Sequence, residues 1–187
     1  MKIMIASDIH GSAAWCRQLT HRFRQEEADR LILLGDLLYH GPRNPLPDEY
    51  SPPAVCEMLN PLAGSILAVR GNCDSEVDQM VLHFPIMADY AIMPVGKRNM
   101  YITHGHLFGE NNPPPLHPGD LLLCGHTHVP CCIEKEAGHV YLNPGSVSLP
   151  KENSHHGYLL LEGTLFRWMD LCGGEKSRWD AQEAVTA

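Results

Sequence analysis

The first half of the chain alternates short apolar runs with stretches of helical periodicity. The apolar runs predict buried strands, and the periodic stretches predict helices, with Ser12 as a candidate N-cap for the first of them. The predicted strands cover residues 2–6, 30–34 and 65–69, and the predicted helices cover 12–27, 53–60 and 75–83. This order of elements is typical of parallel βαβ units.

The second half is richer in strands, which we expect near residues 99–103, 120–124, 139–142, 157–162 and 165–170. Residues 40–53 contain five prolines and are expected to form a loop, as is the proline-rich stretch 111–118. The last dozen residues lack an apolar period and are expected to fray. We therefore predict a single α/β (α+β) domain over residues 1–187, in which two mixed sheets pack face to face with helices outside.

Composition places the chain among globular proteins, because 44% of its 187 residues are hydrophobic and 19% are charged. The net charge is −8, from 14 basic and 22 acidic residues. A sequence-independent nucleic-acid binder needs a basic stripe, and the sequence has none. We expect any contact with phosphate to be local, through metal ions or a few arginines.

The N-terminal apolar run is far shorter than a signal-peptide core or a membrane span, so we expect a cytoplasmic protein without membrane contact. The seven cysteines are odd in number, which argues against a disulfide framework. No Cys-x-x-Cys pair occurs among them, which argues against a structural zinc site.

Histidine is unusually frequent, with twelve in the chain, and several stand beside glycine in short patterns at predicted strand ends. These patterns are Ser-Asp-Ile-His-Gly (7–11), Gly-Asp (35–36), Gly-Asn-Cys-Asp (71–74), His-Gly-His (104–106) and Gly-His-Thr-His (125–128). Because ligands gather at the carboxyl ends of strands in α/β sheets, we expect carboxylates, an amide and imidazoles to share one crevice.

The spacing within these patterns suits metal ions. In an extended chain, residues i and i+2 point to the same side, so Asp8 and His10 can hold one cation, and His126 and His128 share that spacing. The carboxylate of Asp36 can bridge two cations and offset their repulsion. An amide oxygen and a further imidazole are available from Asn72 and His104.

Oxygen and nitrogen ligands without thiolate favour Mn, Fe, Co, Ni or Zn over Ca. A pair of such ions makes hydroxide at neutral pH and neutralises charge on phosphoryl oxygens. The sequence has no Gly-x-Ser-x-Gly elbow and no Walker glycine loop. The sequence therefore predicts metal-dependent hydrolysis of phosphate esters.

The ordered set of five patterns resembles that of the calcineurin-like metallophosphoesterases, and within them that of small bacterial phosphodiesterases of the YfcE type. The resemblance covers about residues 1–160, including His-Gly-Pro-Arg-Asn at 40–44 and Asn-Pro-Gly-Ser-Val-Ser at 143–148. It implies a metallophosphoesterase β-sandwich with flanking helices and a phosphoric diester hydrolase. A hydroxide that bridges two metal ions would attack the phosphodiester bond.

The resemblance also implies how the ligands divide. One ion would be held by Asp8, His10, Asp36 and His128, and the other by Asp36, Asn72, His104 and His126. Manganese is the ion expected from the family, with Zn, Fe, Co or Ni as alternatives. By resemblance to the small bacterial members of the family, we expect this protein to form a homodimer or homotetramer and to act on a small phosphodiester.

One position departs from many relatives, which have His after Gly-Asn where this chain has Cys73. A thiol is a poorer proton donor than imidazole at neutral pH, so we expect slow turnover of esters with poor leaving groups. Cys73 and Asp74 are candidate catalytic residues, and His40 or His106 is a candidate acid. Arg43 is a candidate ligand for substrate phosphate.

Simpler interpretations remain for single residues. Asp8 can cap the following helix, Asn72 with Gly71 can form a turn, and a lone histidine is more often a packed core residue than a ligand. Arg70 can form an ordinary ion pair. At the level of function, the alternatives are a phosphomonoesterase on a small or protein substrate, and a non-catalytic protein-binding scaffold of the same fold.

Overall fold

The computed structural model describes residues 1–182, and its first sheet has six strands in the order β11-β10-β9-β1-β2-β3. The strands are β1 (Lys2–Ala6), β2 (Arg30–Leu33), β3 (Ile66–Ala68), β9 (Gly157–Glu162), β10 (Leu165–Asp170) and β11 (Glu175–Asp180). The first three are parallel, whereas β9, β10 and β11 continue the sheet from β1 in antiparallel fashion.

The second sheet has five strands in the order β4-β5-β6-β8-β7. Its strands are β4 (Tyr90–Val95), β5 (Arg98–Thr103), β6 (Leu121–Leu123), β7 (Cys131–Glu134) and β8 (Val140–Asn143). The central strands β5, β6 and β8 are parallel, and the two outer strands are antiparallel to their neighbours. Both sheets are thus mixed.

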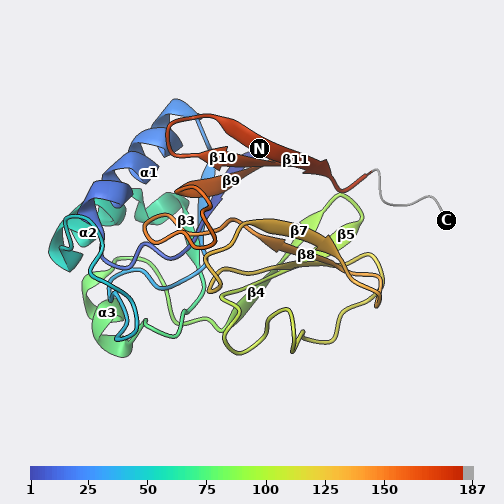
Figure 1. Ribbon diagram of the computed structural model, residues 1–187, viewed down its shortest axis with the longest axis horizontal. Helices are drawn as coiled ribbons and strands as arrows, with labels where there is room; N and C mark the ends of the chain where they lie inside the picture. Colours follow the sequence, from blue (N-terminus) through green and yellow to red (C-terminus); the bar gives the residue numbers. More distant parts are fainter. Residues whose placement is uncertain (183–187) are drawn as a thin grey trace.

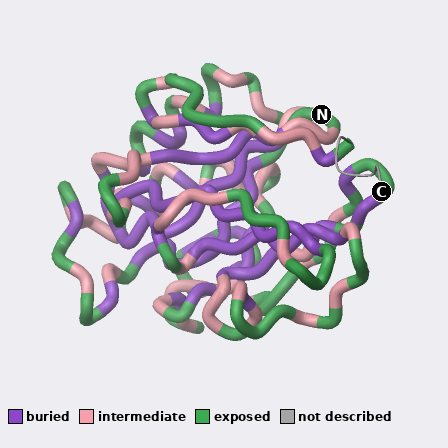
Figure 2. Tube along the Cα trace, turned by 45° about the vertical axis from the view of Figure 1, so that its right-hand side comes forward, coloured by how far each residue is buried: buried purple, intermediate pink, exposed green. Residues whose placement is uncertain are grey.

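The two sheets face each other across a core that contains Ile5 and Leu34 from the first sheet and its loops, and Ile102, Leu121 and Leu142 from the second. A second core lies on the other face of the first sheet, under the helices. The helices are α1 (Ala13–Gln25), α2 (Pro52–Leu59), the 3-10 helix η1 (Asn60–Ser65) and α3 (Glu76–Val81), and they gather on one side of the molecule in Figure 1. Figure 2 shows that buried backbone runs through the middle of the molecule.

This architecture confirms the predicted sandwich of two mixed sheets with flanking helices. The N-cap of α1 is Ser12, whose hydroxyl accepts a hydrogen bond from the backbone N–H of Trp15. Within the described residues, no helix is long and apolar enough to cross a membrane.

Three strands are absent from the sequence-based expectation, and all three lie at sheet edges: β4, β7 and β11. Their residues are largely exposed or half-buried, so the apolar signal that marks an interior strand is weak. Strand β11 also corrects the prediction that the last dozen residues fray, because Ser177–Asp180 pair with β10. The rest of that prediction reaches residues 183–187, outside the described part of the chain.

Candidate metal centre

The five sequence patterns meet at one end of the sandwich. Asp8 follows β1, Asp36 follows β2 and Asn72 follows β3, while His104 follows β5 and His126 follows β6. These strands run parallel within their own sheets, so their carboxyl ends bring the patterns to the same edge. Both sheets therefore contribute side chains to one centre.

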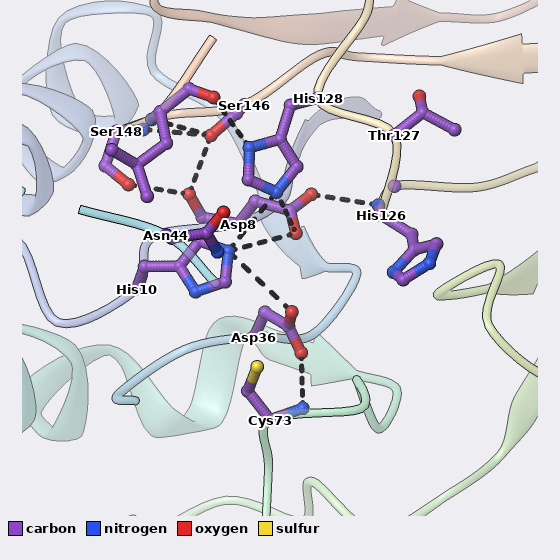
Figure 3. Close-up of polar contacts among 12 residues, drawn as sticks. Asp8, His10, Asp36, Asn44, Cys73, His126, Thr127, His128, Ser146 and Ser148 are labelled. Carbon is purple, nitrogen blue, oxygen red and sulfur yellow. Dashed lines mark hydrogen bonds and ion pairs between the residues drawn. The ribbon is translucent and has the colours of Figure 1, made fainter. Parts of the chain in front are cut away.

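The first group of ligand atoms surrounds Asp8. Its Oδ1 lies 3.5 Å from Nε2 of His10 and 3.3 Å from Nε2 of His128, and the two Nε2 atoms are 3.3 Å apart. All three side chains are almost completely buried. Figure 3 shows these atoms pointing toward one another, with Asp36 beside them.

The second group surrounds His104. Its Nε2 lies 3.1 Å from Oδ1 of Asn72, 3.2 Å from Nδ1 of His126 and 3.4 Å from Oδ2 of Asp36. The same Oδ2 of Asp36 is 3.7 Å from Nε2 of His10, in the first group. One carboxylate oxygen thus joins the two groups, as the sequence-based hypothesis of a bridging Asp36 requires.

Backbone carbonyls fix which ring nitrogen faces the centre. Nδ1 donates to Tyr39 O in His10 (2.9 Å), to Leu34 O in His104 (2.7 Å) and to Leu149 O in His128 (2.6 Å). When these imidazoles are neutral, their Nε2 lone pairs point at each other and at carboxylate oxygens. Electron-pair donors packed at such distances repel unless a proton or a cation lies between them. The donor set therefore fits metal ions.

The two carboxylates are held in the same manner. Oδ2 of Asp8 accepts from the backbone N–H of His126 at 3.0 Å, and Oδ1 of Asp36 accepts from that of Cys73 at 2.8 Å. The other oxygen of each carboxylate faces the centre, and Oδ1 of Asp8 has no hydrogen-bond donor although it is buried. A buried carboxylate oxygen without a donor is costly, and a bound cation would compensate it.

Electrostatics within the protein reinforces this picture. Burial alone would raise the pKa of Asp8, but its contacts with His10 and His128 lower it well below the usual value. Burial would lower the pKa of His104, but the carboxylates of Asp36 and Asp8 raise it to about 9. Protons thus occupy part of the centre when no metal is bound, which is typical of metal-ligand clusters.

The side chains of Asp8 and His10 converge for a reason other than the one the sequence suggested. An extended backbone was expected, but the φ angles are 59° at Asp8 and 49° at His10. Positive φ also occurs at Asp36, His126 and His128. This left-handed conformation is unfavourable for residues with a Cβ, and its concentration at one site is typical of functional centres.

Hydrogen bonds from distant segments hold this strained backbone. Gly35 O accepts from Asp8 N, and Ser146 and Ser148 each donate a hydroxyl hydrogen bond to Asp8 O at 2.9 Å. The Nδ2 of Asn143 donates to the backbone O of Gly125, the residue directly before His126, at 2.7 Å. The turn at 143–146 therefore supports the backbone of the centre.

Asp74 has a different role from the catalytic one expected of it. Its Oδ2 accepts from Asp36 N and Gly71 N, both at 2.8 Å, and its Oδ1 accepts from Leu37 N at 2.9 Å. The carboxylate is buried, and three backbone donors occupy it. We interpret Asp74 as a positioning residue that ties the Asp36 loop to the Asn72 loop.

Two cavities adjoin the centre, and His126 and Thr127 belong to the walls of both. The larger, of about 530 Å³, is lined by Asp36, Gly41, Pro42, Arg43, Asn44, Asn72, Cys73, His126, Thr127, His128 and Lys151. The smaller, of about 300 Å³, includes His106, Glu110, Asn111, Asn112 and Tyr141. We call them the basic cavity and the polar cavity.

The remaining sequence candidates are distributed unevenly over these cavities. Arg43 and Cys73 line the basic cavity, whereas His106 lines the polar one, with its ring centroid 5.4 Å from that of His104. The ring of His40 lines neither cavity and packs against Tyr39 and Tyr50, an arrangement that does not favour a role as proton donor. Lys151 also lines the basic cavity, and no motif in the sequence marks it.

Cys73 lies beside the carboxylate of Asp36, as Figure 3 shows. Burial and the neighbouring Asp36 raise the pKa of its thiol to about 12, so the thiol stays protonated at neutral pH. Such a thiol is a weak hydrogen-bond donor and a weak acid at neutral pH.

Arg70 forms an ordinary ion pair, the simpler of its interpretations, because its Nη2 lies 2.6 Å from Asp89 Oδ1.

The fold and the centre define the class of protein. Residues 1–164 match the calcineurin-like phosphoesterase superfamily domain, and the chain belongs to this superfamily. Among curated proteins, it is 49% identical over 163 residues to phosphodiesterase YfcE of Escherichia coli K12, which covers 87% of this chain and 88% of the relative. It is also 26% identical to the probable metallophosphoesterase YsnB of Bacillus subtilis, over 100% of this chain and 99% of the relative.

Solved structures agree with this assignment. The structure of YfcE, a phosphoesterase from E. coli, superimposes with a TM-score of 0.92 at 44% identity, over 97% of this chain and 100% of that one. Vps29 from Entamoeba histolytica, solved with Zn²⁺, matches with a TM-score of 0.62 at 20% identity, over 97% of this chain and 99% of that one. At that identity, the second match supports the fold alone.

Proposed function

We propose that this protein is a dinuclear, metal-dependent phosphodiesterase. Its ligands would be the seven residues named from the sequence, Asp8, His10, Asp36, Asn72, His104, His126 and His128. The observation that carries the proposal is the convergence of electron-pair donors into two groups that share Oδ2 of Asp36. Separations of 3.1–3.7 Å between these atoms suit ligands that would surround a common divalent ion.

Two bound divalent ions would supply a water-derived nucleophile at neutral pH and neutralise the charge on the phosphoryl group. The chain contributes the arrangement. Asp36 holds the two positions together, and the backbone carbonyls behind the histidines keep the lone pairs aimed at the centre.

Two features favour a diester over a monoester. A diester has two organic arms, and the centre adjoins two cavities separated by His126 and Thr127. The protonated thiol of Cys73 lies where a strong acid would help to expel a poor leaving group. The relationship to phosphodiesterase YfcE points in the same direction.

Three further expectations from the sequence remain predictions. They are manganese as the preferred ion, a homodimer or homotetramer as the assembled state, and the cytoplasm as the location. Metal analysis of the purified protein, light scattering and fractionation of cells would test them in turn.

The decisive test is hydrolysis of bis-p-nitrophenyl phosphate beside p-nitrophenyl phosphate, after chelation and after addition of Mn²⁺. We expect Mn²⁺ to restore diester cleavage that exceeds monoester cleavage. In the Asp36→Ala variant, loss of the shared ligand should abolish both activities. Asp48→Ala, which removes an exposed carboxylate from the 40–53 loop, is the matched control and should retain them.

Other outcomes would redirect the assignment. A preference for the monoester would keep the metal centre but indicate a phosphomonoesterase. Absence of hydrolysis with Mn²⁺, Zn²⁺, Co²⁺ and Ni²⁺, together with binding of a protein partner to the metal-free form, would favour the non-catalytic scaffold.

A further inference from the structure

The basic cavity holds two cations that the metal centre does not use. Arg43 and Lys151 line it and are both exposed, and Asp36 is the one carboxylate among its lining residues. Among the described residues, neither Arg43 nor Lys151 forms an ion pair. In a chain with 14 basic and 22 acidic residues, two unpaired cations facing one cavity point to an anionic ligand.

Both cations come from segments anchored next to the centre. Arg43 lies in a turn closed by Asn44 N to Gly41 O, and the Nδ2 of Asn44 donates to His40 O at 2.9 Å. Lys151 donates its backbone N–H to His128 O at 3.2 Å. The two side chains are thus carried by backbone that the site itself holds in place.

The charge of a diester phosphate does not account for them. That phosphate carries one negative charge, and the proposed ions at the centre would neutralise it. Arg43 and Lys151 are then available for a second group. A phosphate monoester carries between one and two negative charges at neutral pH and accepts several hydrogen bonds, which matches two cations that line one cavity.

We propose that the natural substrate is a phosphodiester with a terminal phosphate on one arm, and that Arg43 and Lys151 bind this second phosphate in the basic cavity. The other arm would occupy the polar cavity, where Asn111, Asn112 and Tyr141 suit a polar group and the carboxylate of Glu110 disfavours a further anion. This inference rests on the proposed phosphodiesterase activity.

The test compares matched p-nitrophenyl phosphodiesters whose second arm is a short flexible alkyl chain ending in phosphate or in hydroxyl. Release of p-nitrophenol is measured in the Mn²⁺-loaded protein at low salt. We expect kcat/KM to be about tenfold higher for the phosphate-terminated substrate, as a pair of exposed charged hydrogen bonds allows. The preference should shrink as KCl is added, because salt screens exposed charges.

Variants assign the preference to the two cations. The Arg43→Gln/Lys151→Gln protein should lower the ratio of the two kcat/KM values to about one, by the loss of both charged contacts. Lys97→Gln removes a charge from the turn between β4 and β5, outside both cavities, and should keep the wild-type ratio. Calorimetry should show the same pattern for binding of an alkyl bisphosphate against the matching hydroxyalkyl phosphate.

The outcomes separate this inference from the proposed function. Equal kcat/KM for both substrates in the wild-type protein would overturn the second phosphate site and leave the phosphodiesterase standing. A preference that survives in the Arg43→Gln/Lys151→Gln protein would also overturn the assignment. If the protein cleaves neither of these substrates and does not cleave bis-p-nitrophenyl phosphate, the proposed function itself is overturned.

Discussion

At the scale of single residues, the centre depends on atoms that point away from it. Three histidines each donate a hydrogen bond from Nδ1 to a backbone carbonyl. The carboxylates of Asp8 and Asp36 each accept a hydrogen bond from a backbone N–H with one oxygen. The remaining atoms have no partner except each other or a bound ion. Substitutions at this scale should therefore change metal binding or proton transfer more than they change the fold.

Cys73 offers the clearest change in chemistry. We predict that Cys73→His raises kcat/KM for phenyl phosphate, an ester with a poor leaving group, by about tenfold or more, because imidazole is a better proton donor at neutral pH than this thiol. Cys73→Ser supplies no such acid and should leave the rate near that of the wild type. An unchanged rate in the His variant, with metal content intact, would contradict a role for this position in leaving-group protonation.

The raised pKa of His104 predicts a pH dependence in the metal-free protein. Its proton stabilises the fold fully below about pH 6.5, the ordinary histidine value, and this stabilisation is lost as the pH rises through about 9. We expect the Tm in chelator to fall between these values. A bound metal replaces the proton, so the fall should be smaller with Mn²⁺, and an equal fall in both samples would argue against ligation by His104.

At the scale of elements, the loops after the strands are tied together by backbone hydrogen bonds. Asp74, in the loop after β3, accepts hydrogen bonds from Asp36 N and Leu37 N in the loop after β2, and from Gly71 N in its own loop. Because these loops carry Asp36 and Asn72, the geometry of the second group of ligands depends on a side chain that does not itself face the centre.

Removal of this tie should cost both stability and metal affinity. We predict that Asp74→Ala lowers the free energy of unfolding by roughly 3 kcal/mol or more, since three buried N–H groups lose their acceptor. Calorimetric titration with Mn²⁺ should show weaker binding. Asp78→Ala removes the capping box of α3 and should cost about 1 kcal/mol while Mn²⁺ binding is retained. Equal metal affinity in both variants would exclude the positioning role.

At the scale of the whole molecule, the proposed ions would connect the two sheets. Asp8, Asp36 and Asn72 follow strands of the first sheet, whereas His104 and His126 follow strands of the second. A ligand that binds only the folded state stabilises it by mass action. Metal binding at this position should therefore resist separation of the sheets.

We predict that chelation lowers the Tm by roughly 5–10 °C relative to protein with Mn²⁺ at about 100 times its Kd, where the linkage energy is about 2.7 kcal/mol. Asp36→Asn should remove most of this difference, because its amide is a poorer bridge between ions. Differential scanning calorimetry with and without chelator gives the measurement. A metal-independent Tm in the wild-type protein would contradict the proposed cross-link.

The sequence determined the interior of this protein, because buried strands and the helices packed on them leave strong apolar patterns. It also determined the chemical type of the centre, since Asp8, Asp36 and His104 stand directly after such strands. The edge strands β4, β7 and β11 left no comparable pattern, because exposed positions are under weaker constraint from burial.

Tertiary structure alone decided how the ligand atoms face one another. The left-handed backbone at Asp8 and His10 is maintained by contacts with residues far along the chain, among them Ser146 and Ser148. Local propensity opposes that conformation, so no local pattern predicts it. The same holds for Lys151, which reaches the basic cavity through a backbone hydrogen bond to His128 and carries no motif of its own. Sequence spacing thus predicted which groups meet, and long-range hydrogen bonds set their geometry.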